Sequence, residues 1–275
     1  MKSTIEKTAD GTIELKISIP WTIIKKEWDI QVSEMVKSAN LPGFRKGKAP
    51  KKLVEERLDK ARIQDEVVRK ILPPAYVEAV KEHNIRPIID PRIHVDGQLQ
   101  EGKEWQFHAV TSEAPIIELN GYKDEIKKIT AKSKIVVPGK EPEPPKLDEI
   151  VKALMTSVKI SIPKILIDRE ADRLLSQMLD EIKKLGMSLD QYLASTGKTA
   201  DALRAEYAQK AEQDLKLEFA LQKIAQTEKI TVEESEIDKT IENAKPEEKE
   251  SLRANKYLLA GILRQQKTLD FLRNL

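Results

Sequence analysis

The chain has 275 residues, of which 40% are hydrophobic and 34% are charged. This length predicts two domains, with room for one extension. The 48 basic and 46 acidic residues leave a formal net charge of only +2, so any binding to nucleic acid must come from a local patch. No cysteine is present, which excludes disulfide bonds, thiolate metal sites and cysteine nucleophiles.

Charged residues are scattered among the apolar ones throughout the first 25 positions, so no hydrophobic signal core is seen there. No stretch of the chain approaches the roughly 18 consecutive apolar residues that a membrane-spanning helix needs. We therefore expect a soluble, cytoplasmic protein without membrane contact.

The first elements predicted are a β-hairpin and a helix. Within residues 3–19, apolar and polar side chains alternate, and Asp10-Gly11 supplies the turn. Pro20 ends the second strand. Apolar residues at helical spacing then predict a helix over residues 21–39.

The next segments complete a small α+β domain. A loop leads to a short helix that starts at Pro50, and a longer helix is predicted over residues 59–84 with a disturbance at its two prolines. A second hairpin is predicted from strands at 88–95 and 103–111. The order β-β-α-α-β-β therefore predicts one α+β domain over residues 1–112.

Residues 113–146 have the composition of an extended linker. Five prolines lie in this stretch, and only one short strand, at 125–129, is predicted. From residue 147 to residue 275 the chain is predicted to be helical and elongated, with arm-like helices. The predicted helices are 147–158, 164–185, 188–195, 199–227, 233–244 and 247–273.

A basic loop with one aromatic residue stands out at residues 43–50, which read GFRKGKAP. Five of the eight residues from 45 to 52 are basic and none is acidic, and the two glycines permit a tight, protruding turn. Cations beside an exposed ring suit binding to RNA or to a ribosome, because the cations meet phosphates while the ring stacks. The alternative is a solvated basic loop whose Phe44 packs back into its own domain.

The same loop does not fit a nucleotide-binding P-loop. Three residues instead of four separate Gly43 from Gly47, and Ala49 follows Lys48 where that motif has Ser or Thr. We therefore expect no ATP binding.

The histidines and acidic clusters do not predict a catalytic or metal site either. His94 and His108 are expected on facing strands, but a third ligand is not evident. Acidic clusters such as Glu233-Glu234 fall in first turns of helices, where they complement the helix dipole. We expect no cofactor, no metal and no enzyme activity.

The run GFRKGKAP resembles the GFRxGKxP hallmark of the ribosome-binding domain of trigger factor. Six further segments, spread over nearly the whole chain, are similar to other parts of that family in the family's order. Two of them are MSLDQYLASTGKT (187–199) and IAQTEKITVEESEIDKTI (224–241). The other four are ILPPAYVEAVKEHNIRPI (71–88), APIIELNGYKDEIKK (114–128), SIPKILIDREADRLLSQML (161–179) and LRQQKTLDFLRNL (263–275).

The resemblance implies a chaperone that docks near the nascent-chain exit tunnel of the large ribosomal subunit, against ribosomal protein and rRNA. The docking residues would be Gly43, Phe44, Arg45, Lys46, Gly47 and Lys48. The helical domain would hold nascent or unfolded chains, and a weak homodimer is left open. Family members usually carry an FKBP-type prolyl isomerase domain after the linker, and no candidate segment for that domain is found here.

The helical half has more apolar residues than an open bundle can bury, and exposed apolar patches suit a promiscuous client surface. A core role for these residues remains the alternative. Residues expected to contact clients are Leu174, Met178, Leu203, Tyr207, Leu217 and Phe219.

Three functions stay in competition at this point. The first is an ATP-independent holdase on the ribosome. The second is a ribosome-associated assembly factor that binds folded partners, and the third is a peptidyl-prolyl isomerase with an unrecognised pocket.

Overall fold

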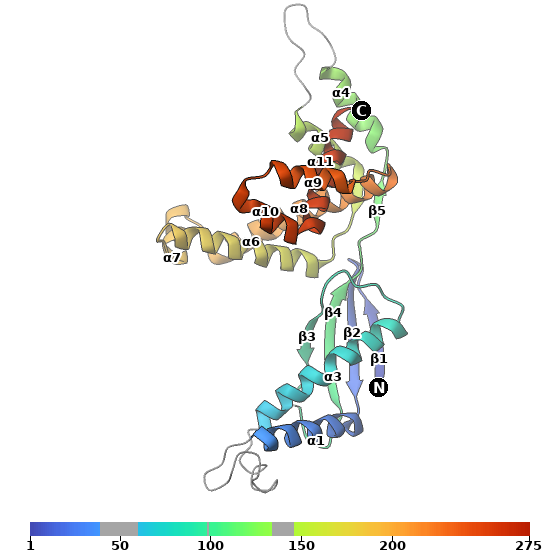
Figure 1. The fold of residues 1–275 in the computed structure, drawn as a ribbon, viewed down its shortest axis with the longest axis vertical. Helices are drawn as coiled ribbons and strands as arrows, with labels where there is room; N and C mark the ends of the chain where they lie inside the picture. The colour runs from blue at the N-terminus through green and yellow to red at the C-terminus, as the bar shows by residue number, and fades with distance from the viewer. Residues whose placement is uncertain (39–59, 98, 134–145) are drawn as a thin grey trace, which may run out of the picture. The chain divides into compact units, whose positions relative to one another are not determined.

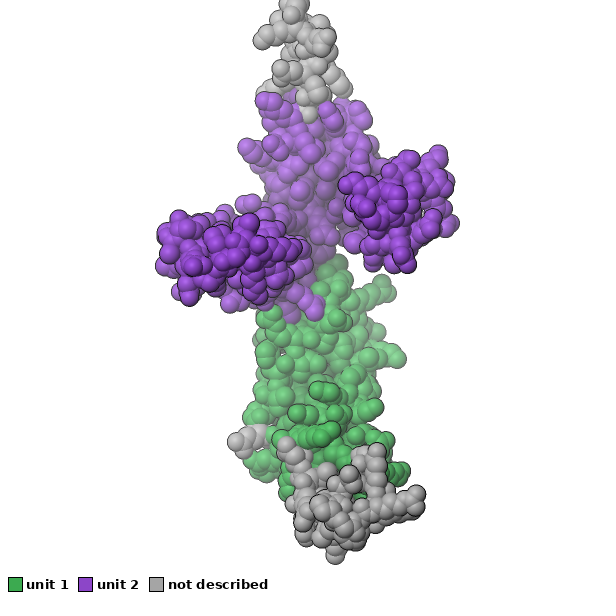
Figure 2. All heavy atoms as spheres, turned by 60° about the vertical axis from the view of Figure 1, so that its left-hand side comes forward, with its two compact units in different colours: residues 1–114 green, residues 115–275 purple. Residues whose placement is uncertain are grey.

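The structure is a computed structural model that describes residues 1–38, 60–97, 99–133 and 146–275. Its chain divides into two compact units, Met1–Ala114 and Pro115–Leu275, which are coloured separately in Figure 2. Unit 1 combines a sheet with helices, and unit 2 is mostly helical. A mixed unit followed by a helical unit is the coarse architecture that the sequence analysis expects.

Unit 1 is built on a four-stranded antiparallel sheet (Figure 1). Its strands lie in the order β1-β2-β4-β3, and two helices pack on one face of the sheet. In chain order the described elements are β1 (Lys2–Lys7), β2 (Thr12–Ile19), α1 (Trp21–Ser38), α3 (Lys60–Glu82), β3 (Arg92–Val95) and β4 (Trp105–Ser112).

The core of unit 1 follows from strand alternation. Along β2, the apolar residues from Ile13 to Ile19 are all buried, while Lys16 between them is exposed. Trp105 and Phe107 of β4 are also buried, and the apolar sides of α1 and α3 cover this face. The hairpin turn lies at Gly11, whose φ of 89° suits glycine.

Helix α3 runs from Lys60 to Glu82 through Pro73 and Pro74, close to the predicted range of 59–84. Proline removes a helical N–H donor, but buried side chains on both sides of the pair hold the helix against the core. These side chains are Ile71, Leu72, Ala75 and Ala79.

Strand β3 is shorter than expected, because it covers only Arg92–Val95 of the predicted 88–95. Pro87 precedes the missing part and Pro91 ends it, and neither proline has an N–H to donate to a ladder. Ile88 N still donates to Ser112 O over 3.0 Å, so this stretch lies along the sheet without continuing it.

Unit 2 begins with part of the predicted linker. Residues Ile117–Leu119 form β5, which pairs antiparallel with β6 (Val158–Ile160), and Tyr122–Ser133 form helix α4. The linker over 113–146 and the short strand at 125–129 were therefore wrong for these residues. The remaining helices are α5 (Leu147–Ser157), α6 (Lys164–Lys184), α7 (Leu189–Thr196), α8 (Ala200–Thr227), α9 (Glu234–Asn243), α10 (Pro246–Ala254) and α11 (Lys256–Arg273).

Helix α4 is part of unit 2 because its apolar face is buried in the central core. Ile126 is completely buried, and it packs with Ile150 and Leu154 of α5, Ile224 of α8 and Leu272 of α11. Five prolines suggested an extended chain, but four of them lie beyond this helix, in the part of the segment that the structure leaves undescribed.

Helix ends in unit 2 are marked by side-chain caps. Ser188 forms a capping box with Gln191, and Thr199 accepts from Ala202 N. The predicted helix 247–273 is two helices, because the backbone leaves helical geometry at Asn255 (φ −115°, ψ 35°). Within the residues that the structure describes, no helix has both the length and the apolar content to cross a membrane.

Candidate functional site

The predicted ribosome-docking loop, Gly43–Lys48, lies outside the described residues. Its role therefore stays a prediction. The predicted client-contact residues all lie in described helices of unit 2, so their burial can be compared with the expectation.

Two of them are core residues. Met178 of α6 and Leu203 of α8 are 7% and 4% exposed and form a small cluster with Ile182 near α7. Tyr207 packs against the same cluster and is half-buried. The expectation that Met178 and Leu203 lie on the surface was wrong, because α6 and α8 pair along their apolar sides and close over them.

The other three predicted residues, Leu174, Leu217 and Phe219, are half-buried. Leu217 packs against the central core of unit 2. None of the three lines the apolar cavity between α8 and α11, although Glu218, which stands between Leu217 and Phe219, does.

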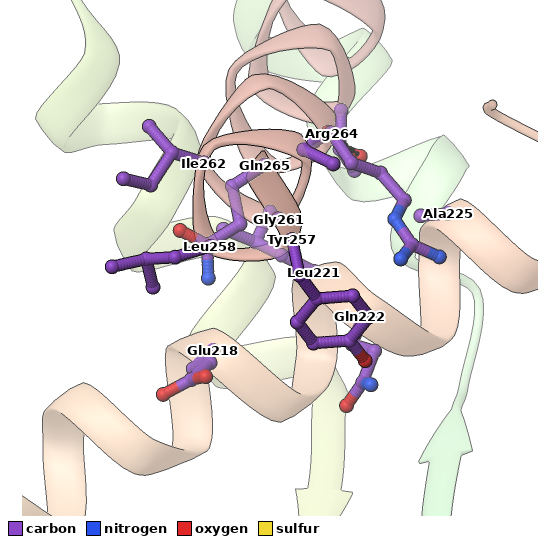
Figure 3. A pocket seen from close by; sticks show the side chains of 12 residues that line it. Glu218, Leu221, Gln222, Ala225, Tyr257, Leu258, Gly261, Ile262, Arg264 and Gln265 are labelled. Carbon is purple, nitrogen blue, oxygen red and sulfur yellow. Dashed lines mark hydrogen bonds between the residues drawn. The ribbon is translucent and has the colours of Figure 1, made fainter. Parts of the chain in front are cut away.

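That cavity, which we call the α8/α11 groove, has a volume of about 410 Å³. Its floor consists of Leu221 and Ala225 of α8 and Thr268 of α11, all of them buried. Figure 3 shows that the side chains of α11 gather above α8 around this space. The other lining residues are Glu218, Gln222, Tyr257, Leu258, Ala260, Gly261, Ile262, Arg264 and Gln265.

The rim of the α8/α11 groove is unusually apolar for a solvent-facing surface. Tyr257, Leu258 and Ile262 are 91%, 64% and 53% exposed. Large apolar side chains grouped at a cavity mark a binding surface more often than scattered ones do. These residues were not among the predicted client contacts, although residues 257–263 form an apolar run too wide for a single helix face.

Gly261 keeps the middle of the groove open. A Cβ atom placed on it would have no neighbouring atom within 4 Å. Glycine inside a helix is destabilising by about 0.5–1 kcal/mol relative to alanine. Gly261 therefore leaves space in the groove but makes helix α11 less stable than alanine would.

Polar contacts hold α11 in place beside α9. Lys267 Nζ donates to both carboxylate oxygens of Glu236 and to Thr231 O, each over 2.8–2.9 Å. At the start of α11, Lys256 Nζ lies 2.8 Å from Asp238 Oδ1. The helix that forms one wall of the groove, α11, is therefore bound to its neighbours through both Lys256 and Lys267.

The groove has one carboxylate and one guanidinium on its walls. Burial, and to a smaller extent the nearby Glu170 carboxylate, raise the pKa of Glu218, while Arg173 opposes the shift. Arg173 is itself committed to Glu170, since its Nε donates to Glu170 Oε2 over 2.8 Å. Among the described residues, neither Glu218 nor the Arg264 guanidinium has an ion-pair or hydrogen-bond partner.

The histidines of unit 1 do not build a second site. His94 and His108 face each other in the register of β3 and β4, and His108 Nε2 contacts Asp96 Oδ2. Within the described ranges, no three His, Asp or Glu side chains converge as a metal site would require.

Two family models match the chain nearly end to end. The model described as "Bacterial trigger factor protein (TF)" matches residues 1–141, and the one described as "Bacterial trigger factor protein (TF) C-terminus" matches residues 143–274. A single residue separates the two matches.

Curated relatives match somewhat less than half of the chain. The chain is 35% identical over 119 residues to the trigger factor of Corynebacterium jeikeium, which covers 43% of this chain and 22% of that protein. It is 33% identical over 123 residues to the trigger factor of Natranaerobius thermophilus, which covers 45% of this chain and 27% of that protein. The matched part thus spans about a quarter of the length of these relatives.

One solved structure agrees with the fold over the whole chain. It is described as "Promiscuous Substrate Recognition in Folding and Assembly Activities of the Trigger Factor Chaperone". The TM-score is 0.67 and the identity is 14%, with 100% of this chain and 99% of that chain covered. At this identity the likeness establishes a shared fold.

Proposed function

The chain belongs to the trigger factor family, and from this we propose that it is an ATP-independent chaperone of the cytoplasm that docks on the ribosome and holds unfolded chains. Nascent or unfolded polypeptides are its clients. The observation that carries the proposal is the α8/α11 groove with its exposed apolar rim.

Client binding at the groove follows from the hydrophobic effect. Apolar surface transferred from water gains about 25 cal/mol per Å², but ordering a flexible client costs a large part of this gain. A groove of about 410 Å³ accepts one or two side chains at a time. Affinity for an unfolded segment should therefore be weak, on the order of micromolar, and tolerant of client sequence.

Ribosome docking is assigned to the loop Gly43–Lys48. Arg45, Lys46 and Lys48 supply cations for rRNA phosphates or acidic ribosomal side chains, and Phe44 supplies an apolar anchor. The family hallmark in the sequence supports this assignment. The partner proposed is the large subunit at its exit tunnel.

We propose no enzyme activity. The match to the N-terminal family model ends at residue 141 and the match to the C-terminal model begins at residue 143. This spacing supports a chain in which no isomerase domain separates the two parts.

A client-aggregation assay on the full chain tests the proposal. We expect wild-type protein to slow aggregation of a chemically denatured client without nucleotide. The triple variant Tyr257→Ser, Leu258→Ser, Ile262→Ser should lose most of this effect. These side chains are exposed, so the fold should remain, as a circular dichroism spectrum would check.

A matched control replaces exposed apolar residues at the other end of the same unit. Leu185 and Leu189 are 72% and 36% exposed and lie outside the groove. Leu185→Ser with Leu189→Ser should leave the protection largely intact. Equal loss in both variants would mean that the groove is not the main client site, and no protection by wild-type protein would refute the holdase function.

A further inference from the structure

The α8/α11 groove carries two unpaired charges of opposite sign. Glu218 projects from α8 and Arg264 from α11, and both line the same cavity. Two other cations of unit 2 already have carboxylate partners. Arg173 is held by Glu170, and Lys267 is held by Glu236.

The two charges lie toward different ends of the groove. In Figure 3 the Arg264 guanidinium points toward Ala225, whereas Glu218 stands farther toward the start of α8. Seven residues of helix separate positions 218 and 225, which corresponds to about 10 Å at 1.5 Å per residue. Between them lies the apolar floor of Leu221 with the apolar rim above it.

The Glu218 carboxylate on the groove wall has no hydrogen-bonded cation among the described residues. Glu218 keeps part of its surface open to solvent. Burial of the rest raises its pKa, Glu170 adds to the shift, and Arg173, which is bound to Glu170, offsets it only in part. A cation brought by a ligand would correct this imbalance. An anion brought to Arg264 would do the same for the guanidinium, which binds carboxylates through parallel N–H donors.

We infer that the α8/α11 groove selects extended peptide segments in which apolar residues separate one basic and one acidic residue. The basic side chain pairs with Glu218, the apolar residues cover Leu221 and the rim, and the acidic side chain pairs with Arg264. An extended chain advances roughly 3.3 Å per residue, so the two charged residues stand about three or four positions apart. This selectivity rests on the proposed client function and adds two specificity-determining residues to it.

Four labelled peptides of equal length test the inference by fluorescence anisotropy with the full chain. One carries Lys and Glu flanking three apolar residues, one carries two Lys, one carries two Glu, and one carries two Gln at the same positions. Wild-type protein should bind the Lys/Glu peptide most tightly, on the order of fivefold better than the uncharged one, as expected for two partly solvated ion pairs. The preference should shrink at high salt.

Charge variants then assign each end. Glu218→Gln should reduce the advantage of the Lys/Glu peptide from about fivefold to about twofold, because one of the two ion pairs is lost, and should leave binding of the uncharged peptide unchanged or slightly stronger. Arg264→Glu should make the two-Lys peptide the best ligand, and Glu218→Lys should make the two-Glu peptide the best ligand. Retained binding of the uncharged peptide shows in each case that the groove is still folded.

The peptide-binding and aggregation experiments together distinguish a failure of the charge selectivity from a failure of client binding. If wild-type protein binds all four peptides equally, or if the variants keep the wild-type order, the charge selectivity is overturned while client binding stands. If none of the peptides binds and the rim variants do not alter client aggregation, the groove is not a client site and both proposals fall.

Discussion

The Tyr122 hydroxyl donates a hydrogen bond to Glu228 Oε1 over 2.8 Å and so joins the start of α4 to the end of α8. Lys123 Nζ occupies the other oxygen of the same carboxylate, also at 2.8 Å. This contact ties residues near the division between the units to the longest helix of unit 2. It makes α4 a structural member of unit 2.

Removing this hydroxyl should weaken unit 2 slightly. Tyr122→Phe keeps the buried ring but loses the hydrogen bond, which costs about 1 kcal/mol of unfolding free energy. Urea denaturation followed by circular dichroism measures the change. Tyr257→Phe, at a 91% exposed ring without such a bond, is the matched control and should leave the midpoint unchanged.

The Glu228 carboxylate should also make stability depend on acidity. Hydrogen bonds from Lys123 and then Tyr122 hold the pKa of Glu228 below its usual value of 4.5. A carboxyl group whose pKa is lower in the folded state stabilises the fold at pH values above its unfolded-state pKa. This stabilisation is lost as the pH falls through the folded-state pKa. Stability should therefore decline as the pH drops below about 4.5, and Glu228→Gln should flatten this decline. An identical acid profile in wild type and variant would show that this carboxylate is not responsible.

Truncating the buried face of α4 tests the assignment of residues 122–133 to unit 2. Ile126→Ala removes a completely buried side chain and should cost about 2–4 kcal/mol. The loss should appear in the unfolding transition of unit 2 and leave that of unit 1 in place. Leu147→Ala, at a 47% exposed position of α5, should cost less than about 0.5 kcal/mol. If both variants lose equally little stability, residues 122–133 act as a linker and not as part of the core of unit 2.

Gly261 offers a pair of substitutions that separate stability from client binding. Gly261→Ala should stabilise α11 by about 0.5–1 kcal/mol, because the Cβ meets open space and alanine is the better helix former. Gly261→Leu should leave the fold intact but fill the groove and weaken peptide binding several-fold. Thermal unfolding and fluorescence anisotropy measure the two effects. Unchanged peptide binding by the leucine variant would place the ligand elsewhere.

The docking loop makes a prediction about salt. Neutralising Arg45 and Lys46 should weaken ribosome co-sedimentation and reduce the slope of log affinity against log salt by about 0.7–0.9 for each lost phosphate contact. Adding Phe44→Ala should weaken binding further. Lys26→Ala with Lys81→Ala removes two exposed lysines of unit 1 and should change neither quantity strongly. An unaltered slope in the loop variant would rule out phosphate contacts by the loop.

Much of the architecture is encoded locally and can be read from the chain. Alternating residues in 12–19 predict a strand because one face of a sheet must be buried, and the structure buries that face. Ser188 and Thr199 predict helix starts because their side chains satisfy free backbone N–H groups. The family hallmark in residues 43–50 likewise depends only on residue order.

The tertiary structure alone decided which apolar residues are free to bind. Met178 and Tyr257 both lie on helices with apolar neighbours, yet one is 7% and the other 91% exposed. Burial depends on whether another helix covers the residue, and that contact joins positions far apart in the chain. The same reason applies to residues 117–133, whose burial against α5, α8 and α11 outweighs the linker-like composition of the segment around them.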